Sequence, residues 1–257
     1  MEDLCLTKFY ATKILLQQLV SKFPKTRWAF AIGNNDHFPK NVYWQPYIEL
    51  LGKMMLEIGF FTQQQHDQFI LFGSNFVDVQ GVRYVSLDMT LFLPGGEILM
   101  RQEMKGGHRD SAPDTADTDT GTDTGTDTGT DVNTSTARSV VPHLLLWLDD
   151  TLEEAAEQGL MVYFLGHQPL STRLGADELD IYSHHFLQLK VILTKHAASI
   201  RVGLFGHHNV QSLVQVLSAG AGGRGPGGEQ YTIFPAIIAT GVSPRAPNQP
   251  SFNVLYK

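Results

Sequence analysis

Residues 28–39 read WAFAIGNNDHFP, a short apolar run that ends at a glycine and is followed directly by four polar residues. Short apolar runs bounded by glycine and proline are typical of buried β-strands, so we expect a strand over Trp28–Ile32. Open α/β sheets bind their ligands in the crevice beyond the carboxyl ends of the strands. The polar residues after this strand are therefore candidate site residues: Asn34, Asn35, Asp36 and His37.

Two later stretches repeat this order of strand, glycine and polar loop. Residues 160–169 read LMVYFLGHQP, and residues 200–209 read IRVGLFGHHN. Three such loops put histidine nitrogens and amide oxygens at one edge of one sheet, which is what a metal site requires. The later loops add four candidates: His167, His207, His208 and Asn209.

The rest of the chain alternates predicted helices with predicted strands. Apolar residues at helical spacing indicate five helices: 6–23, 47–58, a short helix after the N-cap Thr62, 145–155 and 178–196. Strand patterns indicate five further strands: 76–79 and 82–87, which form a hairpin, then 213–217, 231–239 and 252–256. Residues 91–93 are expected to continue the hairpin. Helix-then-strand units with short links predict an α/β layered fold, here one domain over residues 1–257.

The apolar signal largely vanishes between about residues 95 and 139, where a Thr-Asp-Thr-Gly repeat fills residues 118–129. No apolar face can form there, so we expect a disordered low-complexity insertion. Regular aspartates suggest calcium, but their spacing matches neither an EF-hand loop nor the nonapeptide calcium repeat.

Composition excludes several classes of function. Seven aspartates between Asp110 and Asp131 account for the whole formal net charge of −7, and no basic stripe favours nucleic acid. The single cysteine, Cys5, excludes a disulfide framework and a cysteine zinc site. No apolar run is as long as a membrane span. The formal G-x-G-x-x-G at 220–225 is followed by proline and two glycines where a helix must start, so it is a weak nucleotide-binding signal.

The ordered loops Gly-Asn-Asn-Asp, Gly-His-x-Pro and Gly-His-x-Asn resemble the calcineurin-like metallophosphoesterases. That family usually has GNH(D/E), then GH, then GHxH. The finer similarity is to the acid sphingomyelinase-like and endopolyphosphatase branch, supported by residues 146–155, LWLDDTLEEA, and residues 244–252, PRAPNQPSF. The resemblance runs from about Ala11 to the end, apart from the insertion.

The resemblance implies a set of site residues. Members of this family hold two metal ions with a bridging aspartate, and Asn34, His167 and His207 correspond to ligands of one metal. Asn209 falls where the family usually has a histidine for the other metal, and Asn35 falls where it has its catalytic histidine. An amide cannot act as a general acid because it does not titrate near neutral pH. Asparagine at both positions nevertheless resembles the endopolyphosphatase branch, whose loops read GNND and GHxN.

The family's first two motifs, D-x-H and G-D, would lie before the helix predicted at 6–23. We therefore expect this chain to be the C-terminal part of a larger enzyme or the product of a truncated gene model, with the N-terminal strands of the sheet missing. One metal would then lack its ligands, so the chain alone should be a poor catalyst.

The function implied by the resemblance is metal-dependent hydrolysis of a phosphodiester, or of a phosphoanhydride such as polyphosphate. Divalent Zn, Mn or Fe would suit the histidine and amide ligands. The alternative is a non-catalytic remnant of the fold that binds a metal or a partner. Members of this branch act in acidic vacuole-like organelles or outside cells, which gives the compartment only by analogy.

Several candidates also have a purely structural interpretation. Asn34 suits the left-handed conformation of a tight turn, and Asp36 either orients a neighbour or caps that turn. His37 or His208 is a candidate proton donor, although His208 is as readily a solvent-exposed side chain. Arg173 is a candidate for a bidentate phosphate contact or a solvated loop residue.

Overall fold

The computed structural model describes residues 2–37, 40–92, 140–170, 185–208, 211–217 and 232–239. Its helices are α1 (Glu2–Lys22), α2 (Gln45–Glu57), α3 (Gln63–Phe72), the 3₁₀ helix η1 (Met89–Phe92), α5 (Val140–Glu157) and α6 (His185–Lys195). Its strands are β1 (Asn75–Val79), β2 (Val82–Leu87), β3 (Met161–Gly166), β4 (Ile200–Phe205), β5 (Ser212–Leu217) and β6 (Thr232–Ile238).

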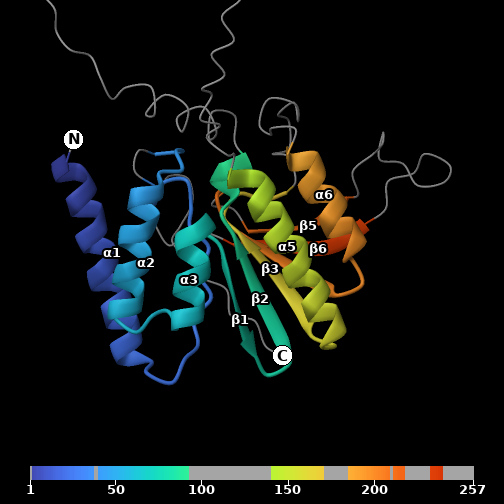
Figure 1. The fold of residues 1–257 in the computed structure, drawn as a ribbon, viewed down its shortest axis with the longest axis horizontal. Helices are drawn as coiled ribbons and strands as arrows, with labels where there is room; N and C mark the ends of the chain where they lie inside the picture. The colour runs from blue at the N-terminus through green and yellow to red at the C-terminus, as the bar shows by residue number, and fades with distance from the viewer. Residues whose placement is uncertain are drawn as a thin grey trace, which may run out of the picture.

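The strands form one six-stranded mixed sheet in the order β1-β2-β3-β4-β6-β5. Strands β2, β3, β4 and β6 are parallel, and β1 and β5 pair antiparallel at the two edges. Helices α5 and α6 lie across the front of the sheet, and α1, α2 and α3 stand in a row beside its β1 edge (Figure 1). The expected α/β layered fold, with a sheet flanked by helices, is confirmed at this level.

Local chemistry explains why several elements begin and end where they do. Gln80 and Gly81 adopt φ values of 51° and 80°, which suits the two-residue hairpin turn between β1 and β2. The Thr62 side chain accepts a hydrogen bond from the Gln65 backbone N–H, and the Gln65 side chain accepts one from the Thr62 backbone N–H. Together they form a capping box at the start of α3. Gly73, with φ 65°, ends that helix in the left-handed conformation.

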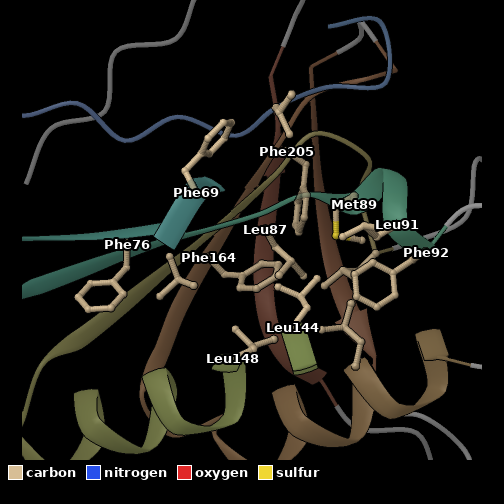
Figure 2. Close-up of a cluster of buried hydrophobic side chains, with 14 of the residues drawn as sticks. Phe69, Phe76, Leu87, Met89, Leu91, Phe92, Leu144, Leu148, Phe164 and Phe205 are labelled. Atoms are coloured by element: carbon tan, nitrogen blue, oxygen red, sulfur yellow. The ribbon is translucent and has the colours of Figure 1, made fainter. Parts of the chain in front are cut away.

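The core lies between the sheet and helix α5. Figure 2 shows Leu144 and Leu148 of α5 directed at Leu87 of β2 and Phe164 of β3. All four side chains are fully buried, and each contributes roughly 1.5–3 kcal/mol by leaving water. This packing fixes β2 and β3 side by side, which matters because candidate site residues follow their carboxyl ends.

Two predictions of secondary structure are wrong. Residues 28–32 are not a strand, because their backbone pairs with no strand in the described part of the chain. Instead, the Gln65 side chain donates to the Trp28 carbonyl at 3.0 Å, and the Trp28 ring stacks on Phe60. Residues 91–92 belong to η1 and do not extend the hairpin, because the Asp88 side chain accepts the Thr90 N–H at 2.9 Å and turns the chain.

Some predictions lie outside the described residues. These are the insertion at 95–139, the start of the helix predicted at 178–196, the glycine-rich stretch at 220–225 and the strand predicted at 252–256. No helix in the described part of the chain is long and apolar enough to span a membrane, as expected from the sequence.

Candidate functional site

The candidate site lies at the carboxyl edge of the parallel strands, where the sheet register brings separate loops together. Leu87 pairs with Gly166, and Leu165 pairs with Leu204, so β2, β3 and β4 end close to one level. The loops after β3 and β4 are also joined directly, because the Gly206 N–H donates to the His167 carbonyl at 2.9 Å.

Three predicted ligands meet at this edge. His167 Nε2 lies 3.0 Å from Asn34 Oδ1 and 3.3 Å from His207 Nδ1. Asn34 is buried, His167 is half-buried and His207 is exposed, so the group runs from the protein interior to the surface. The structure therefore brings Asn34, His167 and His207 together, as the three-loop pattern predicted.

Two glycines leave room for this approach. A Cβ atom on Gly33 would lie 2.9 Å from Cγ of the His167 ring, which is closer than carbon atoms normally come. A Cβ atom on Gly206 would lie 3.4 Å from His167 Nδ1, at the limit of an ordinary contact. The placement of the His167 ring therefore requires glycine at position 33, whereas a methyl group at position 206 would only touch the ring.

The backbone around the site includes unusual conformations. His207 has φ 67° and Asn41 has φ 64°, both in the left-handed region that non-glycine residues seldom adopt. Such strain persists where the surrounding structure determines it, and it is common at functional sites.

The Asn34 side chain is held in one orientation. Its Nδ2 donates to Asn41 Oδ1 at 2.8 Å, and its backbone carbonyl accepts the Asn41 N–H at 3.0 Å. The amide oxygen Oδ1 therefore faces His167, and it also lies 3.4 Å from the Asn35 amide nitrogen.

Either hydrogen bonds or a shared cation would hold together the three atoms that meet here. If His167 Nε2 carries a proton, it can donate to Asn34 Oδ1. If it carries none, its lone pair opposes the lone pairs of Asn34 Oδ1 and can accept only from His207 Nδ1. A cation among the three atoms would instead accept a lone pair from each of them.

The separations also fit a shared metal ion. Two donors that lie about 2.1 Å from one ion, at an angle of roughly 90–110°, are themselves about 3.0–3.4 Å apart. The observed separations of 3.0 and 3.3 Å fall in that interval. Burial lowers the pKa of His167 and outweighs the attraction of Asp36 and Asp88, so its ring is neutral near pH 7, the form that binds metals.

A buried ion pair lies behind the first loop. His37 Nε2 is 3.1 Å from Oδ1 and 3.0 Å from Oδ2 of Asp88, and both side chains are fully buried. Burial alone would lower the pKa of His37, but attraction and hydrogen bonding to Asp88 outweigh it, so the pKa is raised above 6.5. The His37 ring is thus buried as an anchor of the loop, and its proposed part in proton donation remains a prediction.

The other candidates take various positions. Asp36 is exposed and its Oδ2 accepts the Gly33 N–H at 2.9 Å, which caps the turn. Asn35 is exposed, and its carbonyl accepts a hydrogen bond from Lys8 of α1 at 2.8 Å. The His208 ring lies 5.8 Å from the His207 ring. Arg173 and Asn209 lie outside the described residues.

Sequence reasoning missed Asp88 and Asn41. Asp88 directly follows strand β2, as the loops of His167 and His207 follow β3 and β4, but no glycine separates Asp88 from its strand. That strand-then-polar order was the available signal. Asn41 carried no local signal, because its importance lies in its contact with Asn34.

Within the described residues, no three His, Cys, Asp or Glu side chains gather closely enough to hold a metal ion. The group found here differs because one of its three donors is the amide oxygen of Asn34. A scan against protein-family models found no match for the chain, and a search of curated proteins found no significant match.

Proposed function

We propose that this chain forms a metal-dependent phosphoesterase centre of the calcineurin-like type, with a sheet of the corresponding metallophosphoesterase architecture. The observation that carries the proposal is the meeting of Asn34 Oδ1, His167 Nε2 and His207 Nδ1, at 3.0 and 3.3 Å. Its support is the order of the loops, GNND, GHxP and GHxN, which resembles the endopolyphosphatase and acid sphingomyelinase-like branch.

The donor set would hold a divalent ion of the Zn, Mn or Fe type through one amide oxygen and two imidazole nitrogens. Asn209, which lies outside the described residues, is the proposed ligand of the second metal ion. When bound, such an ion lowers the pKa of a nearby water and offsets charge on phosphoryl oxygens.

The protein's own groups prepare the site for this task. The Asp36 carboxylate accepts a hydrogen bond from the Gly33 N–H at 2.9 Å, which holds the loop against the His167 ring. The exposed Asn35 amide, whose Nδ2 lies 3.4 Å from Asn34 Oδ1, is the proposed hydrogen-bond donor to a phosphoryl oxygen, although it cannot transfer a proton. His208 and Arg173 are the proposed contacts to the substrate phosphate.

The proposed substrate is a phosphodiester or a phosphoanhydride chain. Asparagine at positions 35 and 209 favours polyphosphate, because it resembles the endopolyphosphatase loops. The stretch at 244–252 resembles sphingomyelinase-like phosphodiesterases equally well, so both substrate classes belong in the test.

The test combines metal content with turnover. The full chain is dialysed with Zn²⁺, Mn²⁺ or Fe²⁺, its bound metal is measured, and hydrolysis of bis(4-nitrophenyl) phosphate and of polyphosphate is followed. We expect retained metal and slow metal-dependent hydrolysis in the wild type, and loss of both in His167→Ala. His66→Ala, which changes a histidine on α3, is the matched control and should retain both. A wild-type chain that retains no metal would overturn the proposal.

A second candidate function is a metal-binding module without hydrolase activity. It is favoured by the carboxylates nearest the site, because Asp36 bonds to the Gly33 backbone and Asp88 pairs with His37. Both carboxylates thus already hold protein groups in this arrangement. The same experiment separates the two functions, since the module would retain metal and leave both substrates intact.

A further inference from the structure

We propose that Asn41 is a positioning residue that selects which end of the Asn34 amide faces His167. The proposal rests on the metal centre proposed above and adds a residue that holds one of its proposed ligands in place. The amide of asparagine has an oxygen that binds metals at one end and an NH₂ group that repels them at the other, in nearly the same shape. Something must therefore choose between two orientations that differ by a half-turn.

Two hydrogen bonds tie Asn41 to Asn34. The Asn34 Nδ2 donates to Asn41 Oδ1 at 2.8 Å, and the Asn41 N–H donates to the Asn34 carbonyl at 3.0 Å. The backbone bond places the two residues side by side, and the side-chain bond takes up the NH₂ end. With Asn41 presenting its oxygen, the Asn34 oxygen end faces His167 Nε2 at 3.0 Å.

Packing does not account for Asn41. The residue is exposed, yet it holds a left-handed φ of 64° that most side chains resist. Asparagine tolerates that conformation, and so does glycine. An exposed residue in a strained conformation, whose side chain is bonded to a buried candidate ligand, is explained by what it does to that ligand.

The consequence is a loss of metal affinity when the side-chain bond is removed. Groups that orient a metal ligand typically change affinity by about 10–100-fold when they are mutated. Asn41→Gly keeps the backbone conformation and removes the acceptor. Asn41→Asp keeps an acceptor oxygen and tolerates the same φ, so it should rescue binding.

A double mutant separates positioning from a general effect on the loop. In Asn34→Asp the ligand has two equivalent oxygens, so no orientation needs to be selected. Asn41→Gly should then weaken metal binding about 10–100-fold in the wild-type background and leave the affinity of Asn34→Asp unchanged. A loop that is simply disturbed would lose affinity in both backgrounds.

The experiment uses Co²⁺ as the probe, with affinity from calorimetric titration and ligand geometry from the visible absorption of the bound ion. The full chain and the variants Asn41→Gly, Asn41→Asp, Asn34→Asp and Asn34→Asp/Asn41→Gly are compared, with unfolding of the metal-free proteins as a check on folding. Equal Co²⁺ affinity in wild type and Asn41→Gly would overturn the role of Asn41 and leave the metal centre standing. A wild type that binds no Co²⁺ would overturn both.

The metal-free protein gives an independent readout. The side-chain amide resonances of Asn34 in a ¹H–¹⁵N spectrum report the hydrogen bond from Nδ2. We expect them to shift and to exchange faster in Asn41→Gly, and to stay near their wild-type positions in Asn41→Asp. Unchanged resonances in Asn41→Gly would show that Asn41 does not hold the amide.

Discussion

Asn34 Oδ1 lies 3.0 Å from His167 Nε2, although 133 positions separate the two residues in the chain. The contact joins a loop that precedes all six strands to a loop that follows β3. No local pattern can produce it, since it depends on how helices α2 and α3 hold the first loop beside the sheet. It is also the contact on which the proposed metal centre depends. Three features of the structure, two beside this contact and one away from it, can be tested separately.

The first feature is the space at Gly33. A Cβ atom there would lie 2.9 Å from the His167 ring, whereas one at Gly206 would lie 3.4 Å from it. We expect Gly33→Ala to displace the ring, destabilise the protein by about 1–3 kcal/mol and abolish tight metal binding. Gly206→Ala, the matched control, should have a much smaller effect on both. Denaturant unfolding and Co²⁺ titration measure these effects, and equal behaviour of the two variants would contradict the steric argument.

The second feature is the buried pair His37–Asp88. Because the pKa of His37 is raised above 6.5, the pair contributes its full stability below about pH 6.5 and loses it as the pH rises through the raised pKa. Asp88→Asn keeps an acceptor for the Thr90 N–H but removes the charge. We expect it to cost about 3–5 kcal/mol in acid and less in alkali, measured by urea unfolding at about pH 5.5 and about pH 8.5.

The control for that variant is Asp67→Asn, which removes the carboxylate of an exposed pair with His66. Water screens this pair, so no measurable change in stability is expected. A loss of stability in Asp88→Asn that is the same at both pH values would show that His37 is not charged in the folded protein.

The third feature lies away from the site, on β2. Arg83 is buried and donates to both oxygens of Asp78 at 2.8 Å, to Glu154 at 2.8 Å and to the Thr151 carbonyl at 3.0 Å. A lysine cannot match this forked geometry. We expect Arg83→Lys to lower the free energy of unfolding by about 1–3 kcal/mol.

The exposed variant Arg27→Lys serves as its control and should stay within about 0.5 kcal/mol of the wild type. Urea unfolding measures both. Metal binding should be unchanged in Arg83→Lys if the sheet edge keeps its shape, so a loss of binding without a loss of stability would contradict the assignment of Arg83 to the scaffold.

The sequence predicted the parallel strands well and the first loop only in part. The strands before His167 and His207 are largely apolar runs that stop at or near a glycine, with Arg201 as the one charged residue, and such runs indicate buried strands. The run at 28–32 has the same composition, yet it lacks a strand partner in the described part of the chain. A β-strand forms only when its backbone hydrogen-bonds to a neighbouring strand. The residues of one segment do not say whether such a neighbour is present.

The supporting residues were harder to foresee than the ligands. Histidines and asparagines after glycines are typical of ligand loops, so Asn34, His167 and His207 could be chosen from their types and positions. Asp88 and Asn41 are ordinary turn residues by type. Their roles come from tertiary neighbours, His37 for one and Asn34 for the other, which residue patterns do not specify.

The last prediction concerns Asn35, which under the proposed resemblance to metallophosphoesterases takes the place of a catalytic histidine. An amide cannot give a proton to a leaving group, whereas a histidine with a pKa near 6.5 can. Asn35 is exposed, so Asn35→His should fit without disturbing the core. If the chain hydrolyses phosphodiesters, we expect this variant to gain activity, by about 10²-fold or more for substrates whose leaving group needs a proton.

Two substrates with different leaving groups show whether the gain in activity comes from proton transfer. A 4-nitrophenolate leaves without protonation, so Asn35→His should help bis(4-nitrophenyl) phosphate little and an alkyl phosphodiester much more. The rate for the alkyl substrate should also rise as the pH falls through the histidine pKa, because the protonated ring is the acid form. Asn35→Gln keeps an amide and should show neither change. Equal gains for both substrates, or a rate that does not depend on pH, would place Asn35 outside the proton-transfer position.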